Sequence, residues 1–163
     1  MNFISTKGTS ISSIEEALMS GTSEDGGLYM PESIPKINIE ELMTIDNYQE
    51  FSYQLLSHFF KDSSLEDDLK DIINQAFNFP VVSKEYNEGE VQYSVLELFH
   101  GPTAAFKDFG ARFLASTMSE LVKNKNESSL TTILVATSGD TGGAVASAFN
   151  NKTDFKVVIL FPK

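Results

Sequence analysis

Lys107 is the residue of this chain whose surroundings best suit covalent chemistry. It follows a turn signal at Gly101-Pro102, lies among aromatic, small and apolar neighbours, and stands near the start of a long helical pattern. An amine held among apolar groups gives up its proton more readily than one in water. A neutral amine is what attack on a carbonyl compound requires, with a Schiff base as the product. The plainer interpretation is a surface lysine on an amphipathic helix.

The loop Thr137-Ser138-Gly139-Asp140-Thr141-Gly142-Gly143 is a second candidate site. Backbone N–H groups at the start of a helix, with the helix dipole behind them, form an anion site. The hydroxyls of Ser138 and Thr141 add donors, whereas Asp140 argues against a plain phosphate site because its carboxylate would repel the anion. The loop is not a P-loop, since no Gly-Lys-Ser/Thr closes it, and its glycine spacing differs from that of the dinucleotide-binding fingerprint. A tight strand-to-helix turn with glycines for packing stays open as the alternative.

Helical patterns dominate the first half of the chain. Ser13 and Glu16 form a capping box, Asn38 can cap a second short helix, and the prolines at 31 and 35 indicate an irregular connection. His58 lies on a helical stretch with no partner for a site nearby in the sequence, so it is interpreted as a structural or surface histidine. The predicted helices cover residues 14–20, 39–43, 47–61 and 65–77, the last two as a hairpin.

The second half of the chain alternates between strands and helices. Strands are predicted for residues 91–99, 130–136 and 156–161, and helices for 103–123 and 142–149. The strand, helix and strand from residue 130 onward predict a βαβ unit with a parallel sheet. In such a unit the loop after residue 136 lies at the carboxyl end of a strand, where ligands bind in open α/β sheets.

The composition limits the classes of partner. Among 163 residues, 41% are apolar and 21% charged, which is typical of a folded domain with a core. The net charge of −11 argues against nucleic acid, because phosphate contacts need clustered Lys and Arg. The cysteine-free sequence excludes disulfides and thiolate metal ligands, and no metal is expected. The first ten residues show no signal pattern and the longest apolar run near the C-terminus is too short to span a membrane, so a cytoplasmic protein is expected.

Taken together, the motifs resemble those of threonine synthases. Two stretches about 30 residues apart carry the resemblance, Leu98-Phe99-His100-Gly101-Pro102-Thr103 with Phe106-Lys107-Asp108-Phe109-Gly110, and Ala136-Thr137-Ser138-Gly139-Asp140-Thr141-Gly142. The segments Ser5-Thr6-Lys7-Gly8 and Gly21 to Pro31 are similar to the opening segments of that family. The resemblance runs along most of the chain and is much more specific than either motif alone.

The resemblance implies an enzyme of fold type II that depends on pyridoxal 5'-phosphate (PLP). Its family converts O-phospho-L-homoserine and water into L-threonine and phosphate, so the implied partner is this small-molecule substrate. The implied fold is α/β. A mainly helical N-terminal segment covers residues 1–90, and the start of a three-layer αβα sheet, the first part of the PLP-binding domain, covers residues 91–163.

The resemblance also implies roles for single residues. Lys107 matches the lysine that binds PLP and moves protons, and Asp140 would face the ring of the cofactor. Ser138, Gly139, Thr141 and Gly142 match the loop that holds the substrate carboxylate. The weaker candidates flank Lys107 in its motif and carry no assigned role: His100, Asp108 and Arg112.

The length of the chain departs from the family, whose members are more than twice as long. The sequence therefore suggests an N-terminal fragment that is inactive alone, because the loop for the PLP phosphate and the group for the pyridine nitrogen would lie beyond residue 163. The alternatives are another PLP-dependent lyase that eliminates or replaces at the β-carbon, such as a dehydratase, and a non-catalytic fragment or pseudoenzyme. A dinucleotide-binding βαβ enzyme ranks behind both because of the glycine spacing. The sequence leaves the oligomeric state open.

Overall fold

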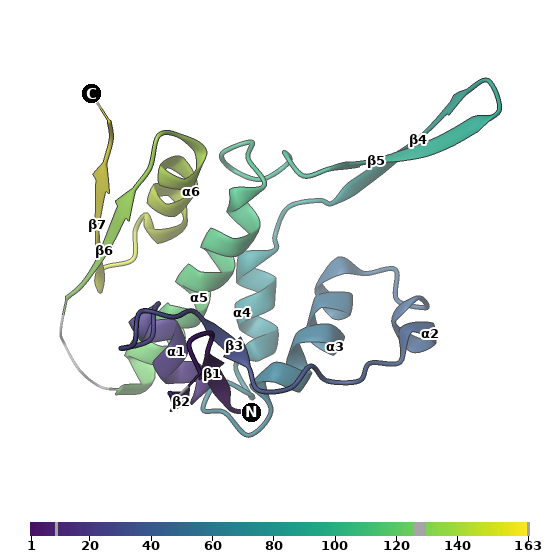
Figure 1. The fold of residues 1–163 in the computed structure, drawn as a ribbon. Coiled ribbons are helices and arrows are strands. Elements are labelled where there is room, and N and C mark those ends of the chain that lie inside the picture. The colour runs from purple at the N-terminus through teal and green to yellow at the C-terminus, as the bar shows by residue number, and fades with distance from the viewer. Residues whose placement is uncertain (9, 126–129, 163) are drawn as a thin grey trace. The chain divides into compact units, whose positions relative to one another are not determined.

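The computed structural model describes residues 1–8, 10–125 and 130–162, and the chain divides into two compact units (Figure 1). The first unit is Met1–Asn74 with Ser116–Glu127, and the second is Gln75–Ala115 with Ser128–Lys163. The unit boundaries fall inside two helices, α4 (Leu69–Ala76) and α5 (Lys107–Lys125). The division at residue 90 that the resemblance implied stays a prediction about the family's domains.

The first unit contains a small antiparallel sheet that the sequence did not reveal. Its strands are β1 (Phe3–Ser5), β2 (Ile11–Ser12) and β3 (Tyr29–Pro31), in the order β2-β1-β3. The irregular connection predicted around residue 31 is therefore wrong in part, because Pro31 pairs with Phe3 at the edge of this sheet. Strands of two or three residues are too short to show an alternating pattern, and a proline is tolerated in an edge strand.

Side-chain caps set the starts of three helices in the first unit. In α1 (Ile14–Ser20) the hydroxyl of Ser13 accepts from the Glu16 amide and the Glu16 carboxylate accepts from the Ser13 amide, so the predicted capping box is confirmed. In α2 (Ile39–Leu42) the Asn38 side chain accepts from the amide of Glu40. In α3 (Tyr48–Phe60) the Asn47 side chain accepts from the amide of Glu50.

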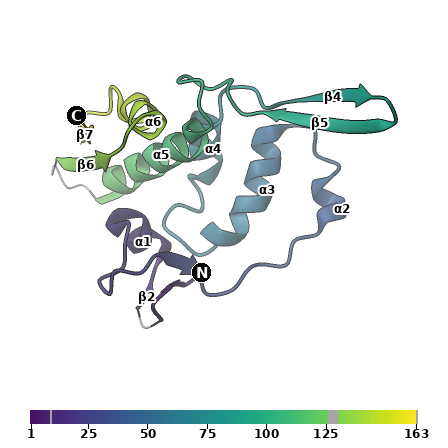
Figure 2. The ribbon, with the colours of Figure 1, turned by 45° about the horizontal axis from the view of Figure 1, so that its top comes forward.

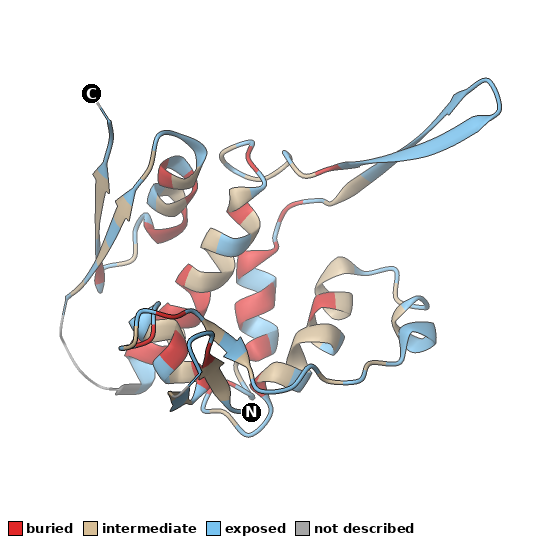
Figure 3. Ribbon diagram, in the orientation of Figure 1, coloured by how far each residue is buried: buried red, intermediate tan, exposed pale blue. Residues whose placement is uncertain are grey.

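Helix α4 begins at Leu69, four residues later than predicted. Asp62 has a φ of 61°, and turns with hydrogen bonds from Ser63 to the Phe60 carbonyl and from Glu66 to the Ser63 carbonyl replace the expected helical start. Leu65 in this turn is nevertheless fully buried. It belongs to the core of the first unit together with the buried residues of α4, which are Leu69, Ile72 and Ile73. Figure 3 shows α4 with buried segments along its length.

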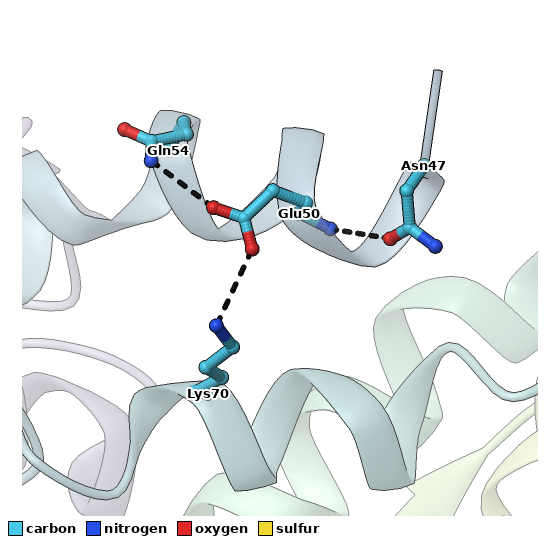
Figure 4. Close-up of polar contacts among 4 residues, drawn as sticks. All are labelled: Asn47, Glu50, Gln54 and Lys70. Atoms are coloured by element: carbon cyan, nitrogen blue, oxygen red, sulfur yellow. Dashed lines mark hydrogen bonds and ion pairs between the residues drawn. The ribbon is translucent and has the colours of Figure 1, made fainter. Parts of the chain in front are cut away.

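One lysine connects α3 and α4. Lys70 Nζ lies 3.4 Å from the Glu50 carboxylate (Figure 4). It also lies 5.6 Å from the centre of the Tyr53 ring. Gln54 donates to the same carboxylate, and these contacts lower the pKa of Glu50, with the Gln54 hydrogen bond as the largest cause. Because Lys70 is exposed and Glu50 is only partly buried, the pair adds little stability.

The second unit contains a hairpin and a βαβ unit. The hairpin pairs β4 (Val82–Glu88) with β5 (Val91–Glu97) in antiparallel register and forms a long two-stranded ribbon (Figure 1, Figure 2). The sequence predicted β5 but not β4, whose residues Lys84-Glu85-Tyr86-Asn87-Glu88 are mostly polar.

The predicted βαβ unit is confirmed. Strand β6 (Thr131–Ala136) pairs in parallel with β7 (Phe155–Leu160), and α6 (Asp140–Phe149) connects them and packs on β7. The rings of Phe149 and Phe155 lie 5.1 Å apart, between helix and strand. The mixed α/β class is thus as predicted, with two parallel strands of the expected sheet present. No helix in the described ranges is both long and apolar enough to cross a membrane.

Replacement of the fully buried Ile72 by alanine tests the core of the first unit. Ile72→Ala is expected to lower the free energy of unfolding by about 2–5 kcal/mol, because the lost methyl groups leave a cavity among buried neighbours. The matched control is Ile34→Ala, where the side chain is 71% exposed and a change within about 0.5 kcal/mol is expected. Urea unfolding of the two variants measures the difference, and equal effects would contradict this description of the core.

Candidate active site

A buried carboxylate organises the turn that precedes Lys107. Asp108 is fully buried, and its two oxygens accept hydrogen bonds of 2.8 Å from the backbone N–H and the hydroxyl of Thr103. Gly101 packs so closely against it that an added Cβ would lie 2.5 Å from Asp108 Oδ2. Ala104 takes a φ of 55°, which no α-helical residue has. The helix predicted from Thr103 therefore begins only at Lys107.

Lys107 is the first residue of α5 and is half-buried. Its Nζ lies 4.2 Å from the centre of the Phe106 ring, a cation–π contact. In the part of the chain that the structure describes, this ammonium has no hydrogen bond or ion pair. The Lys107 side chain thus contacts an aromatic face, and no carboxylate of the described residues pairs with its nitrogen, which suits an amine that reacts with a carbonyl group.

Arg112, one turn further along α5, is tied to the end of α4. Its Nε donates to the Ala76 carbonyl, and its Nη2 donates to the Gln75 carbonyl and to Asn78 Oδ1, each at 2.8 Å. The guanidinium also lies 5.8 Å from the centre of the Phe79 ring. Three carbonyl-type acceptors satisfy most of its donors, so in this structure Arg112 positions α5.

His100 belongs to a charged group at the end of β5. Its Nε2 lies 2.7 Å from Glu97, and Lys84 Nζ lies 2.6 Å from the other oxygen of the same carboxylate. Lys84 is the largest cause, and His100 the next, of a pKa of Glu97 below its ordinary value. The hydrogen bond to Glu97 in turn raises the pKa of Lys84. His100 thus orients the chain between the hairpin and the turn at Gly101.

The loop after β6 leaves backbone donors available. Gly139 caps α6 without any side-chain hydrogen bond among the described residues, in contrast to α1, α2 and α3. The Gly139 amide donates to the Thr137 hydroxyl, whereas the amides of Asp140 and Thr141 find no acceptor in the described part of the chain. Ser138 and Asp140 are exposed. Two amides at a helix start, with the adjacent hydroxyls, can hold a carboxylate.

Gly142 has a packing role in this loop. It is buried, and its amide already donates to the Gly139 carbonyl. A Cβ at this position would lie 2.7 Å from Thr137 Cγ2 and 3.1 Å from Ile159 Cγ2. The absence of a side chain therefore lets α6 approach β7 closely, and the amides without an acceptor among the described residues are those of residues 140 and 141.

In the structure the predicted site residues form two groups, the residues around Lys107 and the loop at 138–142. Asp108 contacts the turn before Lys107 directly, whereas in the described ranges no hydrogen bond or ion pair joins Lys107 to the loop at 138–142. The sequence analysis named Gly101, Thr103 and Phe106 within the motifs but gave them no role, and it did not identify Glu97. The Gly101-Pro102 turn signal pointed to the right segment, but only the fold shows that Asp108 reaches back five residues to Thr103.

Comparisons with known proteins agree with these motifs. The family model described as threonine synthase N terminus matches residues 2–77. The threonine synthase of Escherichia coli K12 is 40% identical over 156 residues, which cover 93% of this chain and 34% of that protein. The enzyme of Buchnera aphidicola from Acyrthosiphon pisum is 42% identical over 151 residues, 91% of this chain and 34% of its own length. The chain spans about a third of the length of the curated relatives it matches.

Solved structures give the same result. The crystal structure of threonine synthase from Escherichia coli superimposes with a TM-score of 0.86 at 37% identity, covering 100% of this chain and 37% of that one. The structure of PLP-bound threonine synthase from Brucella melitensis superimposes with a TM-score of 0.85 at 32% identity, covering 100% and 36%.

Two glycines in α6 provide a matched test of the packing at β7. Gly142→Ala is expected to lower the free energy of unfolding by about 1–3 kcal/mol, because its methyl group collides with Thr137 and Ile159. Gly143→Ala, in the next position, meets open space and should raise it by up to about 1 kcal/mol, since alanine favours a helix. Denaturant unfolding measures both, and a loss of equal size in the two variants would contradict the predicted contact.

The charged group around Glu97 predicts a dependence of stability on pH. Lys84 and His100 hold the pKa of Glu97 below 4.5. The contribution of Glu97 to the stability of the fold is therefore complete above pH 4.5 and is lost as the pH falls through the folded-state pKa. The pKa of Lys84 is raised, so the dependence on pH has the opposite sign. The contribution of Lys84 to the stability of the fold is present below pH 10.5 and is lost as the pH rises through the folded-state pKa.

Glu97→Gln is therefore expected to destabilise the protein at neutral pH and to flatten the loss of stability in acid. Urea unfolding at a series of pH values from about 7 to about 3 measures this. Glu88→Gln, on an exposed position of β4, is the control and should keep the acid dependence of the original protein. An unchanged acid slope in Glu97→Gln would show that this carboxylate is not the group responsible.

Proposed function

Since this chain belongs to the threonine synthase family and corresponds to the N-terminal third of its members, we propose that it supplies the reactive lysine of an enzyme that makes L-threonine. The proposed reaction converts O-phospho-L-homoserine and water into L-threonine and phosphate with PLP. The observation that carries the proposal is Lys107, which stands at the start of α5 with no polar partner among the described residues, after a turn that Asp108 holds in place.

The residues present fit PLP as the cofactor. A lysine nitrogen that pairs with no carboxylate of the described residues is available to the aldehyde of PLP, and it lies 4.2 Å from the centre of the Phe106 ring. When bound, PLP supplies an electron sink for negative charge that develops next to the amino group of the substrate. We further propose the fold-type-II architecture, and a cytoplasmic location that agrees with the cysteine-free sequence.

Each candidate residue has a proposed task. Lys107 holds the cofactor and later moves protons through its Nζ. The amides of Asp140 and Thr141, with the hydroxyl of Ser138, orient the substrate carboxylate at the start of α6, where the helix dipole favours an anion. Gly139 and Gly142 allow that loop its shape, and the Asp140 carboxylate faces the cofactor ring.

The three weaker candidates have proposed tasks in positioning other parts of the chain. Asp108 positions Lys107 by fixing the preceding turn, Arg112 holds α5 on the carbonyls at the end of α4, and His100 fixes the end of β5 through Glu97. None of these tasks requires contact with substrate.

The comparisons match this chain to about a third of the length of threonine synthases. We propose that contacts with the PLP phosphate and with the pyridine nitrogen come from the other two thirds of the family's length. The 163-residue protein is accordingly expected to release no phosphate from O-phospho-L-homoserine on its own, and turnover by the purified chain would contradict this division of the site.

The cofactor lysine can be tested without turnover. Incubation with PLP followed by borohydride reduction is expected to add one cofactor to the protein, and peptide mass spectrometry should locate it on Lys107. Lys107→Ala should lose the label and the visible absorbance. Lys107→Arg keeps the positive charge near Phe106 but cannot bond to an aldehyde, so it should lose both as well.

Lys156→Ala is the matched control for this experiment, since Lys156 is an exposed lysine of the same unit. It should retain the label on Lys107. Labelling spread over several lysines and unchanged by Lys107→Ala would indicate non-specific reaction with PLP, and the proposed role of Lys107 would then be wrong.

A further inference from the structure

Glu97, the last residue of β5, is a buried carboxylate to which the proposed reaction gives no direct part. It is 7% exposed, and its two oxygens lie 2.6 Å from Lys84 Nζ and 2.7 Å from His100 Nε2. A carboxylate withdrawn from water is costly unless it is paired and hydrogen-bonded. Each oxygen of Glu97 therefore has a partner, and the two partners come from different segments, strand β4 and the turn that follows β5.

The register of the hairpin places Lys84 beside Glu97. Lys84 pairs with Val95 and Val82 pairs with Glu97, so Lys84 and Glu97 are diagonal neighbours on one face of the ribbon. A histidine is charged only when it is protonated, whereas the pKa of Lys84 is raised further above neutral by Glu97. Lys84 is thus the partner that balances the charge of this carboxylate at neutral pH.

The connecting turn, residues 98–106, has a buried carboxylate at each end. Glu97 precedes it and Asp108 follows its last residue by two positions. In the described ranges, the hydrogen bonds that involve side chains of this turn go to these two carboxylates, between His100 and Glu97 and from Thr103 to Asp108. The conformation of the turn therefore depends on both carboxylates.

We propose that Lys84 is a positioning residue for Lys107. It acts through Glu97, whose negative charge it balances, so that His100 stays bonded and the connecting turn keeps its shape. This inference rests on the proposed function, in which Lys107 is the reactive amine, and it adds strand β4 to the parts of the chain that place this amine. Lys84 itself contacts neither substrate nor cofactor in this proposal.

Removal of the Lys84 charge affects the turn in either of two ways. Glu97 takes up a proton, or its side chain turns toward water. In both cases the bond to His100 is weakened, because a charge-assisted hydrogen bond is about twice as strong as a neutral one. The turn is then held firmly at Asp108 alone, and the half-buried Lys107 side chain becomes more exposed.

Hydrogen exchange in the 163-residue chain gives the first measurement. The amides of Thr103, Ala104 and Asp108 donate within the turn or to the Asp108 carboxylate. In Lys84→Met, which keeps the length of the side chain but not its charge, their protection is expected to fall by at least about tenfold as the turn opens. Lys84→Arg should keep the protection, because a guanidinium also pairs with a carboxylate.

The reactivity of Lys107 gives a second measurement that does not use PLP. Reductive methylation with formaldehyde, followed by peptide mass spectrometry, compares Lys107 with the exposed Lys156 in the same molecule. Lys84→Met is expected to raise the labelling of Lys107 relative to Lys156 by about threefold or more, since opening of the turn exposes its nitrogen. Lys84→Arg should return the ratio to that of the unchanged chain.

A pH series distinguishes the effect of this charge from a general loss of structure. The titratable groups that face Glu97 are Lys84 and His100, and Tyr86 lies next to Lys84 on the same face. Because Lys84 is the largest cause of the lowered pKa of Glu97, Lys84→Met raises that pKa. The loss of protection in acid should therefore begin at a higher pH in Lys84→Met than in the unchanged chain or in Lys84→Arg.

A double variant tests whether Lys84 acts through Glu97. The protection of the turn in Lys84→Met/Glu97→Gln should be no lower than in Glu97→Gln alone, because the partner of Lys84 is already neutral there. Additive losses of protection would show that Lys84 acts elsewhere, and the proposal would be wrong.

Lys70→Met is the matched control, the same substitution at an exposed lysine that also pairs with a glutamate but belongs to the first unit. It should change neither the exchange in the turn nor the labelling of Lys107. Since Lys70 and Lys84 are both exposed, circular dichroism should show the fold retained in each variant. Unchanged exchange and labelling in Lys84→Met, an equal effect of Lys70→Met, or no recovery in Lys84→Arg would overturn the proposal.

The measurements also separate this proposal from the proposed function. Loss of protection in Lys84→Met, together with no PLP label on Lys107 in the unchanged chain, would support the positioning role and contradict the proposed reaction. A PLP label on Lys107, together with exchange and methylation that Lys84→Met leaves unchanged, would do the reverse.

Discussion

The Asp108 carboxylate lies inside the second unit with both oxygens bonded to Thr103, and the local structure around Lys107 follows from this contact. A buried charge is costly unless hydrogen bonds satisfy it, so the chain from residue 101 to 106 has to fold back over Asp108. That requirement explains the missing side chain at Gly101 and the left-handed backbone of Ala104. It also delays α5 by four residues, which makes Lys107 the first residue of the helix instead of one in its second turn.

Contacts further along α5 hold this helix against the segment that ends α4 and follows it. The Phe109 ring lies 4.9 Å from Phe79 and the Phe113 ring 5.7 Å from Phe77, while Arg112 bonds to the carbonyls at the end of α4. Apolar contacts and directed hydrogen bonds thus act on the same helix. The lysine at its start is held by its backbone, and its nitrogen has no hydrogen bond or ion pair among the described residues.

In the loop at the start of α6, unlike in the turn before α5, two backbone amides have no partner within the described residues. In three helices of the first unit, a serine or asparagine side chain caps an amide of the first turn. Helix α6 instead has Gly139 as its N-cap, and two of its amides have no protein acceptor among the described residues. A glycine at the N-cap costs only a few tenths of a kcal/mol relative to a serine or asparagine cap. A bound carboxylate would recover that stabilisation, which is consistent with a site that is complete only with its ligand.

The sequence by itself determined the features that depend on near neighbours. Ser13 with Glu16 and Asn38 marked helix starts, the β-branched runs before and after α6 predicted two parallel strands, and the lysine and glycine motifs identified the candidate site. Only the tertiary structure decided the contacts between residues distant in sequence or weak in pattern. These include the pairing of Pro31 with Phe3, the polar strand β4 opposite β5, and the reach of Asp108 to Thr103 that moved the start of α5. Local signals act through caps and side-chain periodicity within a few residues, whereas a buried carboxylate or a short edge strand obtains its partner from the fold.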